Sequence, residues 1–173
     1  APNISFSVAE CSQSLSVTGC LVATTTISLS WSSTAADLDY YVLTGFGIAT
    51  TTATSTVYTV PNDNSTYTFT AAARDTTGNQ SAAQTTSVEI STRPIVINEI
   101  AWAGTSSSRS ADEWIEIFNP TSQTVNLSGM QITSLTDSKP TLDLSGTLAS
   151  NGYYLIERTD NDTISDITAN LTA

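Results

Sequence analysis

Apolar and hydroxyl-bearing residues alternate along much of the first half of the chain. In residues 27–32 a serine follows each of Ile27, Leu29 and Trp31, and residues 67–72 show a similar alternation. A period of two residues predicts β-strands with one buried face and one face in water. Roughly seven such segments, bounded by Gly, Asn and Pro turns, fall within roughly ninety residues, which is the spacing of a β-sandwich.

The second half is more apolar and also predicts strands. Residues 95–102, 112–120 and 153–158 are rich in Ile, Val and aromatic residues and are bounded by turn residues. No window keeps the apolar spacing of an α-helix for three turns, so the sequence predicts an all-β chain.

Pro94 marks the expected domain boundary. The 173 residues of the chain are enough for two small domains, and the linker before Pro94 is short. We therefore expect two tandem immunoglobulin-like β-sandwiches, residues 1–93 and residues 94–173.

Charged residues make up only 12% of the chain, whose net charge is −11. The cationic residues are scattered: Arg74, Arg93, Arg109, Lys139 and Arg158. A nucleic-acid site needs clustered cations, so the sequence predicts no nucleic-acid partner. No apolar run reaches the length of a membrane span, and we expect no direct membrane insertion.

Two cysteines, Cys11 and Cys20, lie nine positions apart in a Ser-rich segment. The spacing fits a small disulfide loop, whereas zinc and redox motifs use closer pairs or His partners. The alternative is two free thiols in a reducing compartment. A disulfide would favour an extracellular or cell-surface location.

The residue types needed for most catalytic sites are missing. The chain has no His, which removes the commonest general base and the Ser-His-Asp arrangement. It also has no GxSxG, P-loop or GxGxxG motif. We therefore expect no catalytic residues, and a protein that is not an enzyme.

Two groups of carboxylates are candidate calcium ligands. The first group is Glu99, Asp112 and Glu116, and the second is Asp160 and Asp162. Oxygen ligands of this kind suit Ca²⁺, the one candidate cofactor. The alternative is that these side chains accept hydrogen bonds from turn amides or arginines, or lie in a solvated loop.

Two pairs of adjacent tyrosines bear on binding. Tyr40 and Tyr41, and likewise Tyr153 and Tyr154, should point to opposite faces of a strand, so one of each pair should face outward. An exposed ring can stack on a sugar, and the alternative is core packing or an isolated surface residue.

Residues 1–92 resemble a bacterial fibronectin type III domain. The resemblance rests on Trp31 in the second strand, Tyr67 at the start of the penultimate strand, and the segment Ala-Arg-Asp-Thr-Thr-Gly-Asn-Gln-Ser at residues 73–81. The segment around Cys11 and Cys20 departs from the pattern of that family.

The second half is similar to the lamin-tail domain, in the form found in bacterial secreted and surface proteins. The matching segments are residues 97–100, 113–120, 125–129 and 152–156, with Asn98, Trp114 and Asn119 as fold-defining positions. Met130 stands where an aromatic residue is common. The resemblance implies an immunoglobulin-like sandwich.

Domains of this family continue with one more turn and a pair of strands. We therefore expect the second sandwich to lack its last strands. A longer parent chain, a neighbouring domain or a neighbouring chain would complete it, or the fold closes differently.

These observations predict a non-catalytic extracellular structural or interaction module of a larger exported or cell-surface protein, with a protein or glycan partner. One alternative is a set of accessory domains of a secreted enzyme whose catalytic domain lies elsewhere. Another is a calcium- or carbohydrate-dependent adhesin.

Overall fold

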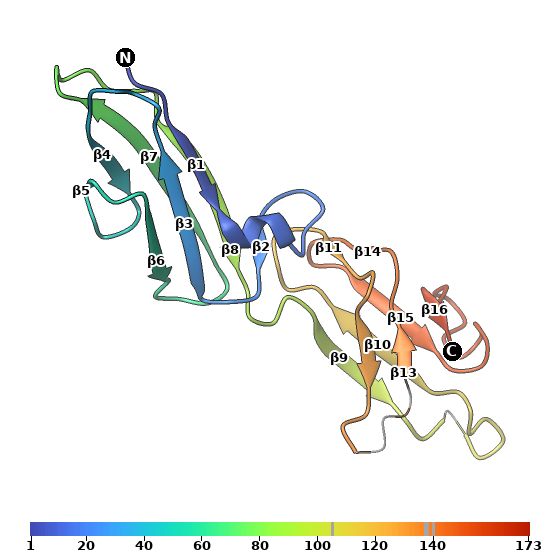
Figure 1. Ribbon diagram of the computed structural model, residues 1–173. Coiled ribbons are helices and arrows are strands. Elements are labelled where there is room, and N and C mark those ends of the chain that lie inside the picture. Colours follow the sequence, from blue (N-terminus) through green and yellow to red (C-terminus); the bar gives the residue numbers. More distant parts are fainter. Residues whose placement is uncertain (105, 137–138, 140) are drawn as a thin grey trace. The chain divides into compact units, whose positions relative to one another are not determined.

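The computed structural model describes residues 1–104, 106–136, 139 and 141–173 (Figure 1). The chain divides into two compact units. Unit 1 contains Ala1–Leu15 and Gly19–Thr92, and unit 2 contains Ser16–Thr18 and Arg93–Ala173. The described elements are β-strands and one short 3-10 helix, η1 (Ala9–Gln13), so the predicted all-β fold class is confirmed.

Unit 1 is a sandwich of two sheets. The first sheet has the order β1-β3-β6, with β1 at Ser5–Val8, β3 at Thr26–Ser32 and β6 at Ser55–Thr59. The second has the order β2-β8-β7-β4-β5, with β2 at Leu21–Val22, β8 at Gln84–Ile90, β7 at Ser65–Asp75, β4 at Leu38–Thr44 and β5 at Thr50–Thr51. The order of the longer strands is that of an immunoglobulin-like sandwich.

The core of unit 1 lies between these sheets and follows the alternation in the sequence. Ile27, Leu29 and Trp31 of β3 are buried, whereas the serines between them are not. Phe69 of β7 is also buried, on the opposite sheet. The predicted buried face of residues 27–32 is therefore confirmed.

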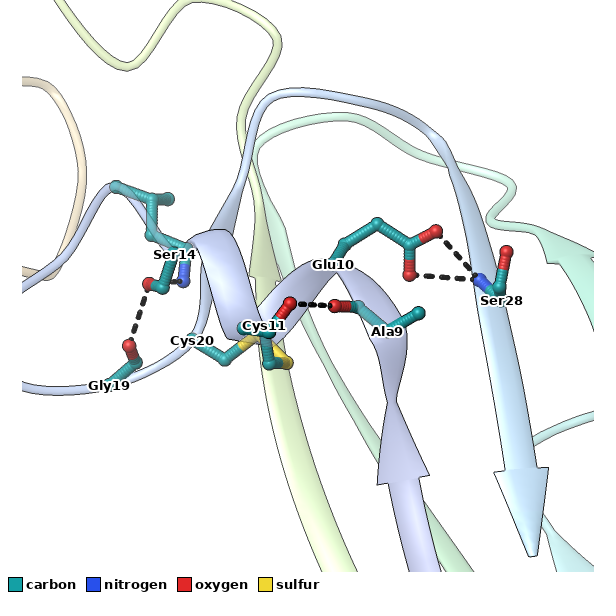
Figure 2. The surroundings of a disulfide bond; sticks show 9 residues. Ala9, Glu10, Cys11, Ser14, Gly19, Cys20 and Ser28 are labelled. Atoms are coloured by element: carbon teal, nitrogen blue, oxygen red, sulfur yellow. Dashed lines mark hydrogen bonds between the residues drawn. A yellow bond between two sulfur atoms is a disulfide. The ribbon is translucent and has the colours of Figure 1, made fainter.

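The N-terminal strand region changes sheets within unit 1, and the disulfide bridges this crossover. β1 pairs with β3, the chain then forms η1 at Ala9–Gln13, and β2 pairs in parallel with β8 in the other sheet. Cys11 of η1 is bonded to Cys20, just before β2, so the predicted disulfide is confirmed (Figure 2). Closing a loop of this length contributes about 2.7 kcal/mol in the chain-entropy model.

The Glu10 side chain also attaches η1 to strand β3. Both carboxylate oxygens of Glu10 accept the backbone N–H of Ser28 in β3, at 3.1 and 2.9 Å (Figure 2). The crossover is thus attached to both sheets of unit 1.

Unit 2 has one four-stranded sheet and two short ladders. The sheet has the order β16-β15-β10-β9, with β16 at Leu171–Thr172, β15 at Tyr153–Glu157, β10 at Trp114–Phe118 and β9 at Val96–Ala101. The ladders pair β11 (Val125–Asn126) with β14 (Thr147–Leu148), and β12 (Gln131–Thr133) with β13 (Thr141–Asp143). The buried core of this unit includes Ile117, Val125, Leu127, Leu148 and Tyr154.

The two outer strands of this sheet differ. β16 lies parallel to β15, and the backbone N–H of Ala173 donates to the carbonyl oxygen of Glu157 at 2.9 Å. β9 forms the other edge and pairs with β10. The absence of further strands in this sandwich stays a prediction.

Candidate functional site

One face of the unit 2 sheet carries two apolar rows that run across three strands. The strand register places Ile100, Ile115 and Ile156 in one row, and Ile97, Ile117 and Tyr154 in the next. Cross-strand partners share a face of the sheet. On β15 and β10, Ile156 and Ile117 are 3% and 1% exposed, but on β9 both Ile100 and Ile97 are 52% exposed. In the described structure this face is therefore covered over β15 and only partly covered over β9.

A hollow of about 570 Å³ opens at the same end of the sheet. Its lining includes Ile100, Ile115 and Ile156 from one apolar row, Leu142 from β13, and the tryptophans Trp102 and Trp114. This volume lies within the range of ligand-binding pockets, which are mainly apolar with a few polar groups. The hollow is thus the candidate binding site of unit 2.

Polar groups stand beside this apolar lining. The Arg158 guanidinium and the Glu113 carboxylate, which both line the hollow, form an ion pair at 2.6 Å. Trp102, at the end of β9, is 77% exposed. The hollow therefore combines an aliphatic floor with an exposed aromatic ring and an ion pair.

The fold-defining Asn98 lies in a β-bulge beside the candidate carboxylates of the first group. The β9–β10 register shifts between Glu116 and Ile117, which leaves Asn98 as the extra residue of β9. Its side-chain amide donates to a carboxylate oxygen of Glu116 at 2.6 Å. Glu99 lies directly opposite Glu116 and is exposed. Two carboxylates therefore face each other across this strand pair.

Asp112, the third member of the first group, lies away from that pair. Its carboxylate accepts from the Arg109 guanidinium at 3.2 Å. This contact is the arginine pairing that the sequence offered as an alternative to calcium.

The second group lies in the loop after β15. A hydrogen bond with Asp160, followed by the charge of Asp160, raises the pKa of Asp162, while the charge of Arg109 acts in the opposite sense. Asp112 also contributes to the raised pKa, so the structure brings Asp112, Asp160 and Asp162 within electrostatic reach of each other. Within the described part of the chain, no three His, Cys, Asp or Glu side chains are placed to hold a metal ion. Calcium binding stays a prediction.

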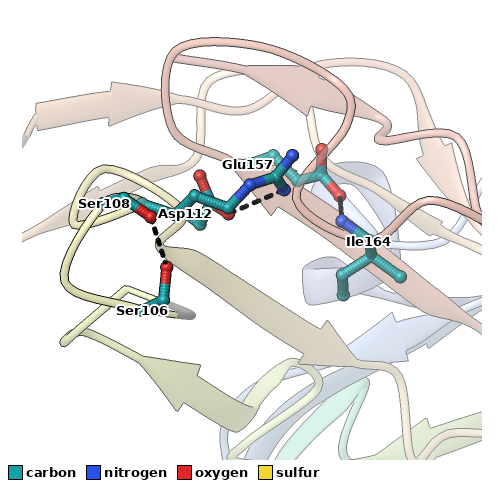
Figure 3. A network of polar contacts seen from close by, with 6 residues as sticks. Ser106, Ser108, Asp112, Glu157 and Ile164 are labelled. Atoms are coloured by element: carbon teal, nitrogen blue, oxygen red, sulfur yellow. Dashed lines mark hydrogen bonds and ion pairs between the residues drawn. The ribbon is translucent and has the colours of Figure 1, made fainter.

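Glu157 is a buried carboxylate that the sequence analysis missed. It is 0% exposed, and one of its oxygens accepts the backbone N–H of Ile164 at 3.0 Å (Figure 3). Its other oxygen has no hydrogen-bond partner among the residues that the structure describes. Alternation along β15 places Glu157 on the face of buried Leu155, which is the one signal in the sequence that could have located it.

Asn119 organises the turn after β10. Its side-chain nitrogen lies within hydrogen-bond distance of the carbonyl oxygens of Gln123 (2.8 Å), Leu148 and Ala149 (both 3.0 Å), which share its two hydrogens. Its side-chain oxygen accepts from the backbone N–H and the hydroxyl of Thr121, at 2.9 and 2.7 Å. Asn119 is 0% exposed, so this one side chain satisfies several buried groups of the β10–β11 and β14–β15 connections.

Tyr67 has a comparable role at a turn of unit 1. Its hydroxyl donates to the carbonyl oxygen of Asn62 at 2.8 Å and accepts the backbone N–H of the same residue at 2.9 Å. A tyrosine near the start of this strand that bonds back to the preceding turn is a feature of immunoglobulin-like sandwiches.

The two tyrosine pairs have the predicted orientations. Tyr41 is buried at 2% exposure, and Tyr40 is only partly buried, with the Arg74 guanidinium 5.8 Å from its ring centre. Tyr154 is 5% exposed, whereas Tyr153 is 56% exposed and lies against Phe118. The prediction that one ring of each pair faces outward is confirmed.

Asp75 makes the stability of unit 1 depend on pH. It is 5% exposed, and hydrogen bonds from the side chains of Asn79 and Thr77 lower its pKa to about 2, from an ordinary 3.8. Because the folded state binds this proton more weakly than the unfolded state, the contribution of Asp75 is complete above pH 3.8. It is lost as the pH falls from 3.8 through 2.

We therefore expect the free energy of unfolding of unit 1 to fall less steeply with decreasing pH in Asp75→Asn than in the wild type. The midpoint of urea unfolding should fall more steeply for the wild type than for the variant between about pH 4 and pH 2. Parallel curves for the two proteins over this interval would contradict the role of Asp75.

No helix in the described part of the chain is long and apolar enough to cross a membrane.

Comparisons with known proteins inform the two units differently. A search of curated proteins found no match. Among solved structures, the chain is similar to chitinase ChiA74 from Bacillus thuringiensis, with 17% identity and a TM-score of 0.38. The match covers 89% of this chain and 26% of the chitinase, so the chain spans about a quarter of that protein. A similarity at this level supports no conclusion about fold or function.

A family model matches the second half of the chain, from the end of unit 1 through unit 2. The resemblance of the second half to lamin-tail domains is confirmed, whereas the fibronectin type III resemblance of residues 1–92 stays a prediction. Lamin tail domains are non-catalytic and immunoglobulin-like, and no catalytic family is indicated. Residues 89–173 match the family model of the Lamin Tail Domain.

Proposed function

We propose that this chain is a non-catalytic structural and interaction module of an exported protein, and that unit 2 docks an apolar segment of a partner. The observation that carries the proposal is the loss of burial along one apolar row, from Ile156 through the partly buried Ile115 to Ile100. Ile156 is 3% exposed and Ile100 is 52% exposed, although the two side chains share a face and border the same hollow. An exposed apolar face of this kind is typical of an interaction site.

Unit 1 serves as a fibronectin type III-like structural domain in this proposal. Its three-stranded and five-stranded sheets, the buried Trp31 and the hydrogen bonds of Tyr67 support that assignment.

An extracellular location fits the covalent chemistry of unit 1. The disulfide between Cys11 and Cys20 closes a crossover between sheets. Disulfides persist in oxidising compartments and are rare in the cytosol. The bond therefore supports export.

Two other functions have less support. A carbohydrate-binding adhesin would use exposed rings such as Trp102 and Tyr153, but Tyr153 is not among the residues that line the hollow, so the two rings do not form one stacking surface there. A role as an accessory region of a secreted enzyme depends on domains outside this chain.

The docking proposal predicts that the hollow takes up an apolar probe. Nile red should bind the full chain with a blue-shifted emission, and Ile100→Ser should reduce this signal by about twofold, because it removes apolar contact area at the hollow. Val57→Ser is the matched control, since Val57 is 67% exposed on β6 of unit 1. Equal signals from wild type and Ile100→Ser would contradict docking at this hollow.

A further inference from the structure

We propose that the partner of unit 2 is an extended β-strand, which pairs with the free edge of β9, places an apolar side chain beside Ile100 and presents a cationic side chain to Glu99. This inference rests on the proposed docking function and names the chemistry of the occupant. The occupant is a peptide segment of a partner protein with alternating apolar and basic residues.

The backbone of β9 is open to pairing on its outer side. This strand is the last in its sheet, and in the described residues its backbone hydrogen bonds go to β10. A strand at such an edge presents a row of N–H and C=O groups on its outer side. An added strand satisfies this row group by group, as in recognition by β-strand addition.

The two faces of β9 differ in chemistry. Ile100 belongs to the apolar row beside the hollow, and the neighbouring Glu99 lies on the opposite face, in register with Glu116. A paired strand would therefore meet an apolar environment on one face and a carboxylate on the other. The alternation of the partner is dictated by this alternation of β9.

The charge of Glu99 favours a cationic side chain on the partner strand. The Glu99 side chain has no hydrogen bond or ion pair within the described ranges, and it faces Glu116 directly across the strands. Like charges in opposite positions of a sheet destabilise it, so a cation beside Glu99 would relieve this repulsion. The chain itself has a net charge of −11, which disfavours a second copy as the occupant.

Two synthetic peptides test the proposal. We expect the acetylated and amidated peptide Thr-Val-Lys-Val-Lys-Val-Thr to bind the full chain, and its counterpart with Glu in place of Lys to bind about two- to fivefold more weakly at physiological salt. The measurement is the change in fluorescence anisotropy of a labelled peptide. Equal binding of the two peptides would overturn the charge argument.

Charge reversal of the protein locates the contact. Glu99→Lys should invert the preference, so that the Glu peptide binds more tightly than the Lys peptide. Asp166→Lys is the matched control, because it makes the same change in net charge at an exposed position of unit 2 outside β9. An unchanged preference in Glu99→Lys, or an inverted one in Asp166→Lys, would contradict pairing at β9.

Backbone methylation tests whether the occupant is a strand. Single N-methyl groups along the Lys peptide should weaken binding by about fivefold at alternate residues and have little effect between them, because a strand donates to one neighbour through every second N–H. A uniform effect would overturn strand pairing.

Nile red binding and peptide binding distinguish failure of strand pairing from failure of docking at the hollow. If Nile red binds in the Ile100-dependent manner but neither peptide binds at millimolar concentration, the hollow takes a different occupant and strand pairing is wrong. Binding of cellohexaose that is lost in Ile100→Ser would likewise overturn strand pairing and identify a saccharide site. Failure of Nile red itself would refute the docking function.

Discussion

Asn119→Ala should destabilise unit 2 by about 4 kcal/mol, because it removes several buried hydrogen bonds and leaves their partners without replacements. The carbonyl oxygens of Leu148 and Ala149 and the hydroxyl of Thr121 lose the side chain that they contact. A domain of this size is stable by only about 4–12 kcal/mol, so the variant would lose much of its folding free energy. The measurement is urea unfolding of the full chain, with hydrogen exchange to assign the transition to unit 2.

An exposed amide provides the control for this variant. Gln131→Ala removes the hydrogen bond from Gln131 to Asp143 at the surface of the β12–β13 ladder, and we expect a change of less than about 0.5 kcal/mol. Similar destabilisation by both substitutions would show that the buried position of Asn119 has no special weight.

Trp31→Ala should have an effect of the same size in unit 1, about 4 kcal/mol. Trp31 is 3% exposed, and its ring centre lies 6.3 Å from that of Tyr41 and 5.7 Å from that of Phe46. Its indole N–H also donates to the carbonyl oxygen of Ala53 at 2.7 Å. Truncation leaves a large cavity between the two sheets and leaves the carbonyl oxygen of Ala53 without this hydrogen bond. Calorimetry should show the lost stability as a lower melting temperature of unit 1.

Val57→Ala is the control for the loss of Trp31. Val57 lies on β6, beside β3 in the same sheet, but it is 67% exposed. We expect a change of at most about 0.5 kcal/mol, because few contacts are lost at an exposed site. A small effect of Trp31→Ala would mean that the core of unit 1 tolerates a cavity at this position.

Local pattern was enough to predict the all-β fold class and the buried face of β3. The alternation around Trp31 reports which side of a strand is apolar, because the period of two residues is a property of the strand itself. The motif around Asn119 pointed to its importance through family resemblance. Its five hydrogen-bond contacts required coordinates, since Leu148 and Ala149 are about thirty residues away.

Other features depend on long-range packing and could not be predicted. The short parallel strand β2 has meaning only beside β8, and β2 itself is too short to carry a periodic signal. Alternation along β15 gives the face on which Glu157 lies, but its full burial and its hydrogen bond from the Ile164 N–H depend on the fold of the following loop.

The candidate site shows the same limit. Sequence identifies Ile97 and Ile100 as apolar positions of a strand, and such positions are normally expected in a core. Whether they are covered depends on how far the opposite layer extends, and in the described structure both side chains on β9 are half exposed.

The covalent link between Cys11 and Cys20 also has a mechanical consequence. If the chain is stretched from its N-terminus, tension passes from η1 through the sulfur atoms to Cys20, so the residues between the two cysteines stay slack. Nine residue spacings amount to about 30 Å of contour length, and all of it beyond the 5.0 Å Cα–Cα distance across the bridge is released only after reduction. In an oxidising environment, unit 1 unfolded by force would therefore reach a shorter extended length than its residue count implies. Reduction of the disulfide would increase this length.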